Sequence, residues 1–489
     1  MRWFVERDWR DDRIAELEAK LVEKDAQLAA EVAARVALEQ QVAALMKQVA
    51  ELTEKLGRNS GNSSSPPSSD SPAERRKRNE RKPSSGRKRG GQKGHGGSHR
   101  ELVAPEKVSE VVDLYPPECE NCWKPLPEVP DASAKRYQQT EFPPVEPHTT
   151  EWRRHAVKCP CCGWTTRAAF DEKVIPQSPF GPRLMAIIAL VTGIYHLSRR
   201  KTAGLLEDVL GVEISLGALS AVEARVSDAV KPAVDEAWER VARADVKHTD
   251  GTSWYQAGAM MALWTIATTA ATVFKIVANG TKDTLRPLYG ALEGILVSDR
   301  AKALNFWAME RRQICFAHLL RKFVSFAERD GPGAAFGREL LDYTGLVFEY
   351  WHDFKTGKLT RAELARWMAP VREHMEALLA KAVAADIASL SGSCADILEH
   401  KLALWTFVEH DGVEPTNNHA EQQIRDFVLW RKRSFGTQSA RGNVFAESVM
   451  TVAHTARKQK KNVLAFLVRC CEARRDGIAP PSLFDAAAA

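Results

Sequence analysis

The sequence predicts a multidomain protein: an N-terminal coiled coil, a small zinc ribbon, a helical module, and an α/β region interrupted by an all-helical insertion. Three observations support this fold class. A heptad repeat lies near the N-terminus, two C-x-x-C pairs follow, and short apolar strands alternate with helices in the second half. A chain of 489 residues is also long enough for several domains with a sizeable core.

A coiled coil is predicted over residues 1–57. Apolar residues recur there with a period of 3.5, which keeps one apolar seam along a helix. The alternative is a single amphipathic helix packed on its own protein. The seam positions are Leu17, Leu21, Leu28, Leu38, Val42, Leu45, Val49, Leu52 and Leu56.

A flexible, basic linker is predicted over residues 58–106. Residues 59–72 are rich in Ser, Pro, Asn and Gly and cannot bury enough apolar surface to order themselves. Residues 74–100 hold 11 basic and 2 acidic residues, a net charge of +9, whereas the whole chain carries +6. Such an arm can follow a phosphate chain, although a solvated charge run without function has the same composition. Its candidate DNA-binding residues are Arg87, Lys88, Arg89 and Lys93.

A zinc-binding domain is predicted over residues 107–170. Cys119 and Cys122 form one C-x-x-C pair, and Cys159 and Cys162 form the second, so four thiolates can surround a structural Zn²⁺. Cys161 is an alternative ligand, and a redox role is the alternative function. The long interval between the pairs predicts extra strands around 137–142 and 151–157. Clustered cysteines of this kind suit a reducing, cytoplasmic environment.

Two capped helices are predicted within the helical module, residues 171–240. Ser198 precedes the first helix, Gly211 follows it, and Ser215 precedes the second. This pattern fits a helix-turn-helix DNA reader, and an ordinary helical hairpin has the same pattern. The candidate DNA contacts are Arg199, Arg200 and Lys201.

Short strands are predicted in residues 241–329, which form the first part of the α/β region. One strand reaches Asp250, and another, after a helix that follows Thr281, reaches Asp299. Acids at strand ends of α/β sheets lie where ligands bind, although a lone Asp there more often caps a helix or closes a turn. The uncharged stretch 256–274 contains too many threonines for a membrane span and predicts two strands instead.

The second part of the α/β region is predicted at residues 411–470, between a helical insertion at 330–410 and a C-terminal tail at 471–489. A third acid, Glu421, lies on a helix in this part. Glu421 shares an apolar stripe with Ile424 and Val428. Its partner is either Arg425, in an ordinary i,i+4 ion pair, or a divalent metal shared with the two aspartates.

Four motifs carry a family resemblance. They are L-G-R-N-S-G-N-S-S-S-P-P-S-S-D, R-G-G-Q-K-G-H-G-G, I-C-F-A-H-L-L-R-K-F, and N-N-H-A-E-Q-Q-I-R-D-F-V-L-W-R-K-R-S-F-G-T-Q-S-A-R-G. With them the chain resembles the DDE transposases of insertion-sequence family sixty-six. The resemblance implies an RNase H-like core and aligns Asp250, Asp299 and Glu421 with the catalytic triad.

The resemblance also implies a mechanism and partners. Two Mg²⁺ or Mn²⁺ ions would direct strand cleavage and strand transfer at DNA phosphates. The expected partners are the terminal inverted repeats, target DNA, further copies joined through the coiled coil, and accessory proteins of the same element, in the bacterial nucleoid and away from membranes. His318 either packs in the core or meets a phosphate. Cations expected near the DNA are Arg425, Arg431, Lys432, Arg433 and Arg441.

Two rival functions are compatible with the same residues. One is a non-catalytic DNA-binding regulator derived from a transposase, which would use only the coiled coil, the basic arm and the zinc ribbon. The presence of all three acids argues against it. The other is a nuclease of the same fold that cuts without joining.

Overall fold

The chain divides into two units. The computed structural model describes residues 9–56, 58–63, 70–74, 76, 101–170 and 178–484. One unit comprises residues 1–79, 297–301 and 307–417, and the other comprises 80–296, 302–306 and 418–489. Among the described residues, no helix is long and apolar enough to cross a membrane.

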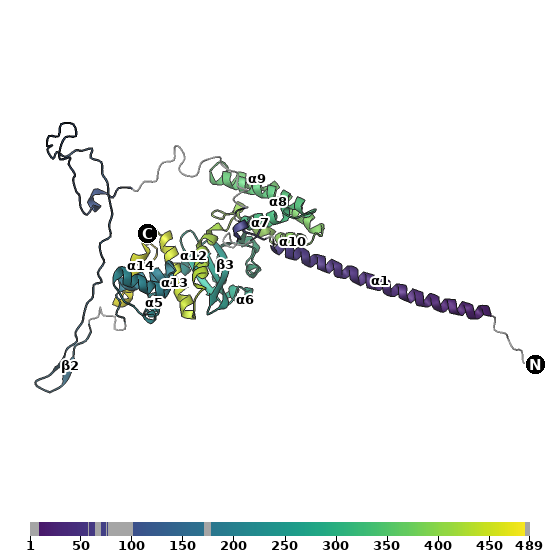
Figure 1. Ribbon diagram of the computed structural model, residues 1–489, viewed down its shortest axis with the longest axis horizontal. Helices are drawn as coiled ribbons and strands as arrows, with labels where there is room; N and C mark the ends of the chain where they lie inside the picture. The colour runs from purple at the N-terminus through teal and green to yellow at the C-terminus, as the bar shows by residue number, and fades with distance from the viewer. Residues whose placement is uncertain are drawn as a thin grey trace, which may run out of the picture. The chain divides into compact units, whose positions relative to one another are not determined.

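A single long helix, α1 (Trp9–Leu56), occupies the region predicted to form a coiled coil (Figure 1). Its described seam residues are exposed: Leu21 by 63%, Leu28 by 61% and Val49 by 62%. The alternative in which this face packs on its own protein is therefore wrong for these residues. An exposed apolar seam is the surface that a second helix covers in a coiled coil.

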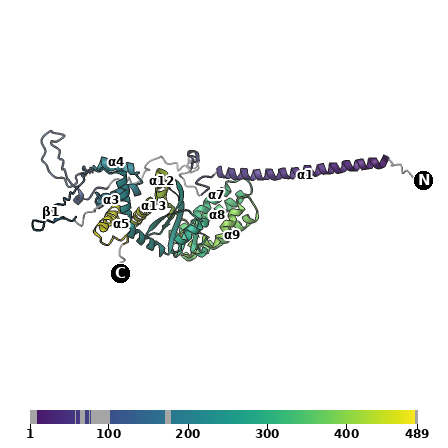
Figure 2. The same cartoon turned by 90° about the horizontal axis from the view of Figure 1, so that it is seen from below.

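The unit that contains α1 is otherwise almost entirely helical, and α8 and α9 run side by side in it (Figures 1 and 2). A capping box between Thr360 and Glu363 starts α9, which buries Leu364 and Met368 and leaves Trp367 on its outer face. Residues 330–410 are helical, as the sequence predicts. From residue 309 onward, the elements of this unit are η4 (Met309–Arg311), β7 (Arg312–Ile314), α7 (Phe316–Ala327), α8 (Gly333–Lys355), α9 (Arg361–Ala384), α10 (Ser391–Glu399), η5 (Lys401–Leu404) and α11 (Thr406–Glu409).

Five strands form a mixed sheet in the order β5-β4-β3-β6-β7. β3 and β4 are antiparallel, with Asp250 opposite Thr265, and β4 and β5 are also antiparallel. β6 starts parallel to β3. The Glu293 amide donates to the Ala242 carbonyl and the Ile295 amide donates to the Asp245 carbonyl, so the two segments advance in the same direction. The strands are β3 (Val246–Gln256), β4 (Ala259–Ala267), β5 (Thr272–Val277) and β6 (Ile295–Ser298). The Thr-rich stretch 256–274 thus holds two strands, as predicted.

Helix α13 (Ala440–Lys458) covers the free edge of β5. Thr455, Thr451 and Glu447, spaced four residues apart, accept hydrogen bonds from the amides of residues 272, 274 and 276 at 3.1, 3.2 and 2.6 Å. Four helical residues rise about 6 Å and two strand residues about 6.6 Å, so the two periods match. An edge whose amides are paired cannot recruit another strand.

Helices complete the unit that carries β3, β4 and β5, and α5 is the longest of them. Along α5, eleven residues are buried, and the helix packs on α3, α13 and α14. Figures 1 and 2 show α13 next to α5. The helices are α3 (Pro182–Ala189), η2 (Leu190–Ile194), α4 (Arg199–Leu210), α5 (Leu216–Ala242), α6 (Lys282–Tyr289), η3 (Lys302–Leu304), α12 (Asn418–Ser434), α13 and α14 (Val463–Asp476).

Residues 101–170 contain little regular structure: η1 (Pro105–Lys107), β1 (Ala156–Lys158) and β2 (Thr165–Arg167), which pairs with β1. The strand expected around 137–142 does not form, and the one expected at 151–157 is confined to its end. These predictions were wrong because β-prone residues need a packed face to form a sheet, and in residues 101–170 no residue is buried.

Candidate active site

Asp250 lies in the middle of β3, not at its end as the sequence predicted. The strand continues to Gln256 because β4 pairs with it over the whole length. Asp250 is half-buried, and one carboxylate oxygen accepts a hydrogen bond from the Gly251 amide at 2.9 Å. Side chains alternate along a strand, so Asp250 shares its face with His248 and Thr252.

The face of β3 that carries Asp250 packs against α12. The His248 and His419 rings have centroids 5.2 Å apart at the start of α12. One helical turn before the end of α12, Arg431 Nη1 donates to Thr252 Oγ1 at 2.9 Å and to Ser253 Oγ at 2.5 Å. The helix and the strand therefore run in the same direction. Asp250 lies between the two contacts on β3, and Glu421 lies between them on α12.

The two flanks of α12 face different parts of the sheet. Gln423 accepts from Thr272 Oγ1 at 3.1 Å, and Asp426 lies 3.2 Å from His454, so that flank faces β5 and α13. Arg431 lies on the opposite flank and reaches β3. Glu421 is on the Arg431 flank by helical position and is half-buried, with its Oε1 atom inside the protein. The structure therefore directs Asp250 and Glu421 towards the same side of α12.

Backbone bonds fix the C-terminal end of α12 to β3. After the helix, Gly436 adopts φ +88°, and a Cβ there would meet the Tyr255 carbonyl oxygen at 2.1 Å, so only glycine fits. The Thr437 amide donates to the Tyr255 carbonyl at 2.9 Å, and the Ala257 amide donates to the Thr437 carbonyl at 2.8 Å. The helix that carries Glu421 is thereby held in register with the strand that carries Asp250.

Asp299 directly follows β6, as predicted, and a buried arginine shapes the backbone around it. The Asp299 carboxylate accepts from the Ala301 amide at 2.9 Å. Arg312 is fully buried and donates to Ser298 Oγ at 3.0 Å and to the Asp299 carbonyl at 2.8 Å. Burial lowers the pKa of Arg312 to about 10, so the guanidinium stays charged at neutral pH. Sequence reasoning missed Arg312, because only its place on β7 beside Ser298 reveals it.

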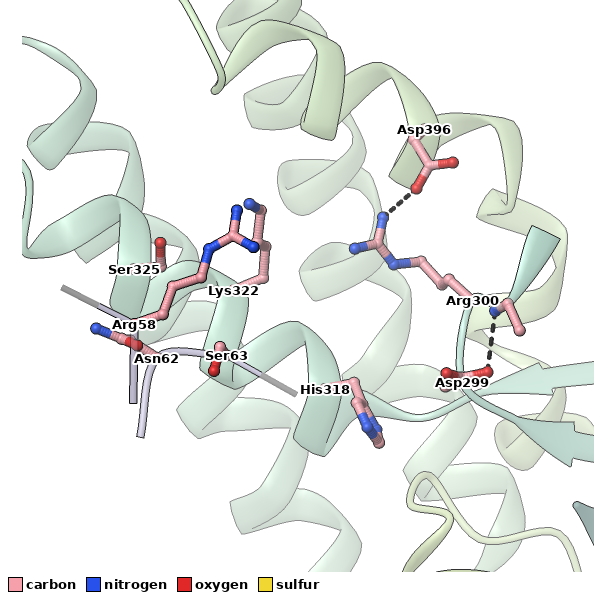
Figure 3. Close-up of a pocket in the computed structure, with 10 residues that line it drawn as sticks. Arg58, Asn62, Ser63, Asp299, Arg300, His318, Lys322, Ser325 and Asp396 are labelled. Atoms are coloured by element: carbon pink, nitrogen blue, oxygen red, sulfur yellow. Dashed lines mark hydrogen bonds and ion pairs between the residues drawn. The ribbon is translucent and has the colours of Figure 1, made fainter. Parts of the chain in front are cut away.

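Asp299 also lines a pocket of about 580 Å³ within its own unit (Figure 3). Arg300 and Asp396 form an ion pair across it at 2.5 Å. His318 on α7 lines the same pocket and is half-buried. The other lining residues are Arg58, Asn62, Ser63, Ala301, Lys322 and Ser325.

A second residue that sequence reasoning missed, Lys458, lies beside the start of α12. Its ammonium donates to the Ala271 carbonyl at 3.2 Å and lies 3.0 Å from His419 Nε2. Burial lowers the Lys458 pKa to about 7. Lys458 therefore links the turn before β5 to the N-terminal end of α12.

The predicted DNA-contacting cations fall into two groups. Arg431 is half-buried and anchors α12, and Arg199 is engaged with Glu223 at 2.5 Å. Arg441 is exposed but donates to Ser220 Oγ at 2.5 Å. Five further predicted cations are exposed: Arg200, Lys201, Arg425, Lys432 and Arg433. Arg87, Lys88, Arg89 and Lys93 lie outside the described residues.

The helical module has the caps predicted from its sequence. The Ser198 and Ser215 side chains accept from the amides of Lys201 and Ala218, and Gly211 is left-handed at φ +62°. One face of α5, from Leu219 to Val241, contributes to the core of the unit, whereas Asp228, Lys231 and Asp235 are exposed. A helical hairpin and a helix-turn-helix DNA reader both contain such an amphipathic helix, so both remain predictions.

The two cysteine pairs form matching turns. The Trp123 amide bonds to the Cys119 carbonyl, and the Gly163 amide to the Cys159 carbonyl, both at 2.9 Å. Backbone amides of the following residues lower the pKa of the Cys119 thiol and, in the same way, that of Cys159. Each turn therefore favours thiolate, the form that binds Zn²⁺. Among the residues that the structure describes, the four sulfurs do not gather into one cluster.

Comparison with known families decides the identity of the chain. Residues 177–444 match the family described as Transposase IS66 family, over more than half of the sequence. The chain belongs to this family. Residues 4–101 match a second family, described as a Family of unknown function (DUF6444), and no curated protein matches the chain. The IS66 match includes all three predicted acids, α12 and the helical insertion, so this part of the transposase holds the candidate site.

Proposed function

We propose that this IS66-family transposase cleaves and joins DNA strands with Asp250, Asp299 and Glu421 as its metal-binding carboxylates. The observation that carries the proposal is the packing of α12 on β3, which directs Glu421 and Asp250 to one side of the helix. Asp299 follows β6, whose start pairs with β3. All three acids lie within the matched family region.

The donor set fits hard divalent cations. Mg²⁺ and Mn²⁺ prefer carboxylate oxygens, and Asp250, Asp299 and Glu421 are each half-buried on or next to an ordered element. When bound, two such ions supply an activated oxygen nucleophile and neutralise charge on the phosphoryl group. Arg431 holds Glu421 in position through β3, and Arg312 holds the Asp299 backbone. No protein nucleophile is required in this reaction.

The other parts of the chain supply binding and assembly in this proposal. The exposed seam of α1 joins copies of the transposase, and the net +9 arm at 74–100 follows the DNA backbone. Cys119, Cys122, Cys159 and Cys162 hold a structural Zn²⁺, since their turns favour thiolates. This segment recognises the ends of the element together with the arm.

The test uses the full chain with Mg²⁺ and DNA that carries the ends of the element. Asp250→Asn, Asp299→Asn and Glu421→Gln should each lower strand joining by about 10³-fold, because several kcal/mol of charge stabilisation is lost. End binding should stay unchanged. Asp283→Asn, an exposed carboxylate on α6, is the matched control. Full activity in all three variants would refute the triad, and cleavage without joining would identify a nuclease instead.

A further inference from the structure

The residue that follows α12, Phe435, combines two features that each cost free energy. Its backbone adopts φ +57°, in the left-handed region that bulky side chains rarely occupy. Its side chain is 76% exposed, although a phenyl ring gains most from being buried. The core therefore does not explain a phenylalanine at this position.

The end of the helix does not explain it either, because the bonds around Phe435 use only its main chain. The Phe435 amide donates to the Arg431 carbonyl at 2.8 Å and ends α12 with a left-handed cap, for which glycine is the ordinary residue. Two residues later, the Thr437 amide donates to the Tyr255 carbonyl on β3 at 2.9 Å. A strained residue that the surrounding bonds hold in place is typical of a binding site.

The segment around the ring is cationic. Residues 431–441 contain four basic residues and no acidic residue. Arg431 and Arg441 donate to the hydroxyl oxygens of Ser253 and Ser220, each at 2.5 Å, and these neutral acceptors fix the guanidinium groups without cancelling their charge. Proteins bind nucleic-acid strands with this combination, in which a ring contacts a base and cations contact phosphates.

Helix α12 sets the distance between this ring and Glu421. At a rise of about 1.5 Å per residue, Phe435 lies about 21 Å beyond Glu421 along the helix axis. One DNA strand advances about 3.4 Å per nucleotide, so this distance spans about six nucleotides. A DNA strand that runs along α12 can therefore reach both residues.

We infer that the Phe435 ring stacks on an open base face of bound DNA, about six nucleotides from the site of the candidate carboxylates. The base is either unpaired or exposed where the ring enters between two base pairs, since both present the same π-face. The position along the DNA rests on the proposed function, whereas stacking needs only that the chain binds DNA.

Photocrosslinking of the full chain locates the contact. In Mg²⁺-free buffer, the protein is bound to a duplex in which iodouracil replaces thymine, or to the same duplex with a single-stranded tail. Light joins iodouracil to an aromatic ring stacked on it, and mass spectrometry identifies the residue. We expect a crosslink to Phe435, while Trp367, 51% exposed on α9, gives the background. Reaction only with the tailed DNA indicates an unpaired base, and equal reaction with both indicates insertion into the duplex.

Variants of Phe435 separate binding from folding. Phe435→Gly removes the strain of the left-handed backbone, so the melting temperature should not fall, whereas affinity for the crosslinked DNA should fall about tenfold because one stacked base is lost. Phe435→Trp keeps an aromatic ring and should bind like the wild type. Ile478→Gly is the matched control, since Ile478 is an apolar residue, 64% exposed, that follows the end of α14 in the same unit. Its affinity should be unchanged.

Three results would overturn the inference. One is background crosslinking of Phe435 with both oligonucleotides. Another is a lower melting temperature of Phe435→Gly with unchanged DNA affinity, because the ring would then support the fold. The third is loss of self-association with unchanged DNA affinity, which would identify a second copy as the partner.

Strand joining separates this inference from the proposed function. Full joining by Asp250→Asn, Asp299→Asn and Glu421→Gln would refute the proposed triad, and the crosslink to Phe435 would still identify stacking. Conversely, background crosslinking of Phe435 in a protein whose joining depends on Glu421 would refute only the stacking.

Discussion

The α12–β3 region and the cysteine segment at 107–170 contain the two proposed metal sites, and they are built in opposite ways. Phe427, Ile424 and Trp254 are buried where α12 meets the sheet, so a packed core holds the two elements that carry Asp250 and Glu421. In residues 101–170 no side chain is buried, and Trp123, Tyr137 and Trp164 are exposed by 71%, 88% and 73%. One site is positioned by its own core, whereas the other has only local turns.

This difference predicts where each site obtains its stability. A carboxylate on a packed helix and strand is in place before any metal binds, so metal binding adds activity rather than fold. A pair of cysteine turns without a core gains its fold from the metal itself. The predictions below test this contrast, beginning with the largest effect.

Zinc removal should have the largest effect, and only on the cysteine segment. Structural zinc contributes on the order of 10 kcal/mol to folding of small domains. Chelation should make 107–170 sensitive to limited proteolysis and abolish recognition of the ends, while unfolding of strands β3–β5 and the helices packed on them stays unchanged. Local amides lower the pKa of Cys119 and Cys159. Zinc should therefore stay bound down to a lower pH in this protein than in an unstructured peptide that carries the same cysteines.

Single cysteine variants identify the fourth ligand. Cys162→Ser should release zinc and Cys161→Ser should retain it, as measured by the metal content of the purified protein. The reverse result would place Cys161 in the site.

Loss of Arg431 should have the next largest effect. Arg431→Met leaves the oxygens of Thr252 and Ser253 without their charged donor and should lower the free energy of unfolding by about 2–3 kcal/mol. Strand joining should fall with it, because α12 loses its register on β3. Arg433→Met, an exposed change on the same helix, should stay within about 0.5 kcal/mol in urea unfolding. Equal effects of the two variants would contradict the anchoring role.

Thr451→Val should cost about 1–2 kcal/mol. The substitution keeps the shape of the side chain but leaves the Phe274 amide at the buried edge of β5 without its acceptor. Thr451→Ser keeps the hydroxyl and should recover most of the loss. Hydrogen exchange at the Phe274 amide gives the direct measurement, and an unchanged exchange rate in Thr451→Val would show that α13 does not protect this edge.

Glu447→Gln should have the smallest effect, and it should raise the free energy of unfolding, whereas the preceding substitutions lower it. Burial raises the pKa of Glu447 above its ordinary value of 4.5, so folding favours the protonated form. Its contribution to stability is therefore present below pH 4.5 and is lost as pH rises through the folded pKa. Glutamine keeps an acceptor for the Ile276 amide and should remove this loss. The difference in free energy of unfolding between variant and wild type should grow with pH, and a constant difference would contradict the shift.

Local signals predicted much of the fold. Caps at Ser198 and Ser215 and the left-handed Gly211 follow from residue chemistry within one turn, and each is confirmed. The Glu421 stripe is visible for the same reason, since helical period is a local property.

Features that depend on distant partners were not predictable. β3 continues past Asp250 only because β4 pairs with Gly251 and the residues beyond it, which read alone as a turn. The Arg312 contact joins β7 to the residues after β6, and the Asn62–Glu328 bond joins segments 266 residues apart. Polar side chains make these contacts, so a periodic pattern of apolar residues in the sequence does not reveal them.

The cover that α13 places over β5 has a consequence for the assembly proposed above. If several chains join through α1 or collect on one DNA molecule as proposed, their sheets meet at a high effective concentration. An open strand edge would then join sheet to sheet and end in aggregation. Because Thr455, Thr451 and Glu447 already occupy the amides of β5, crowding of this kind does not turn that edge into a site of polymerisation.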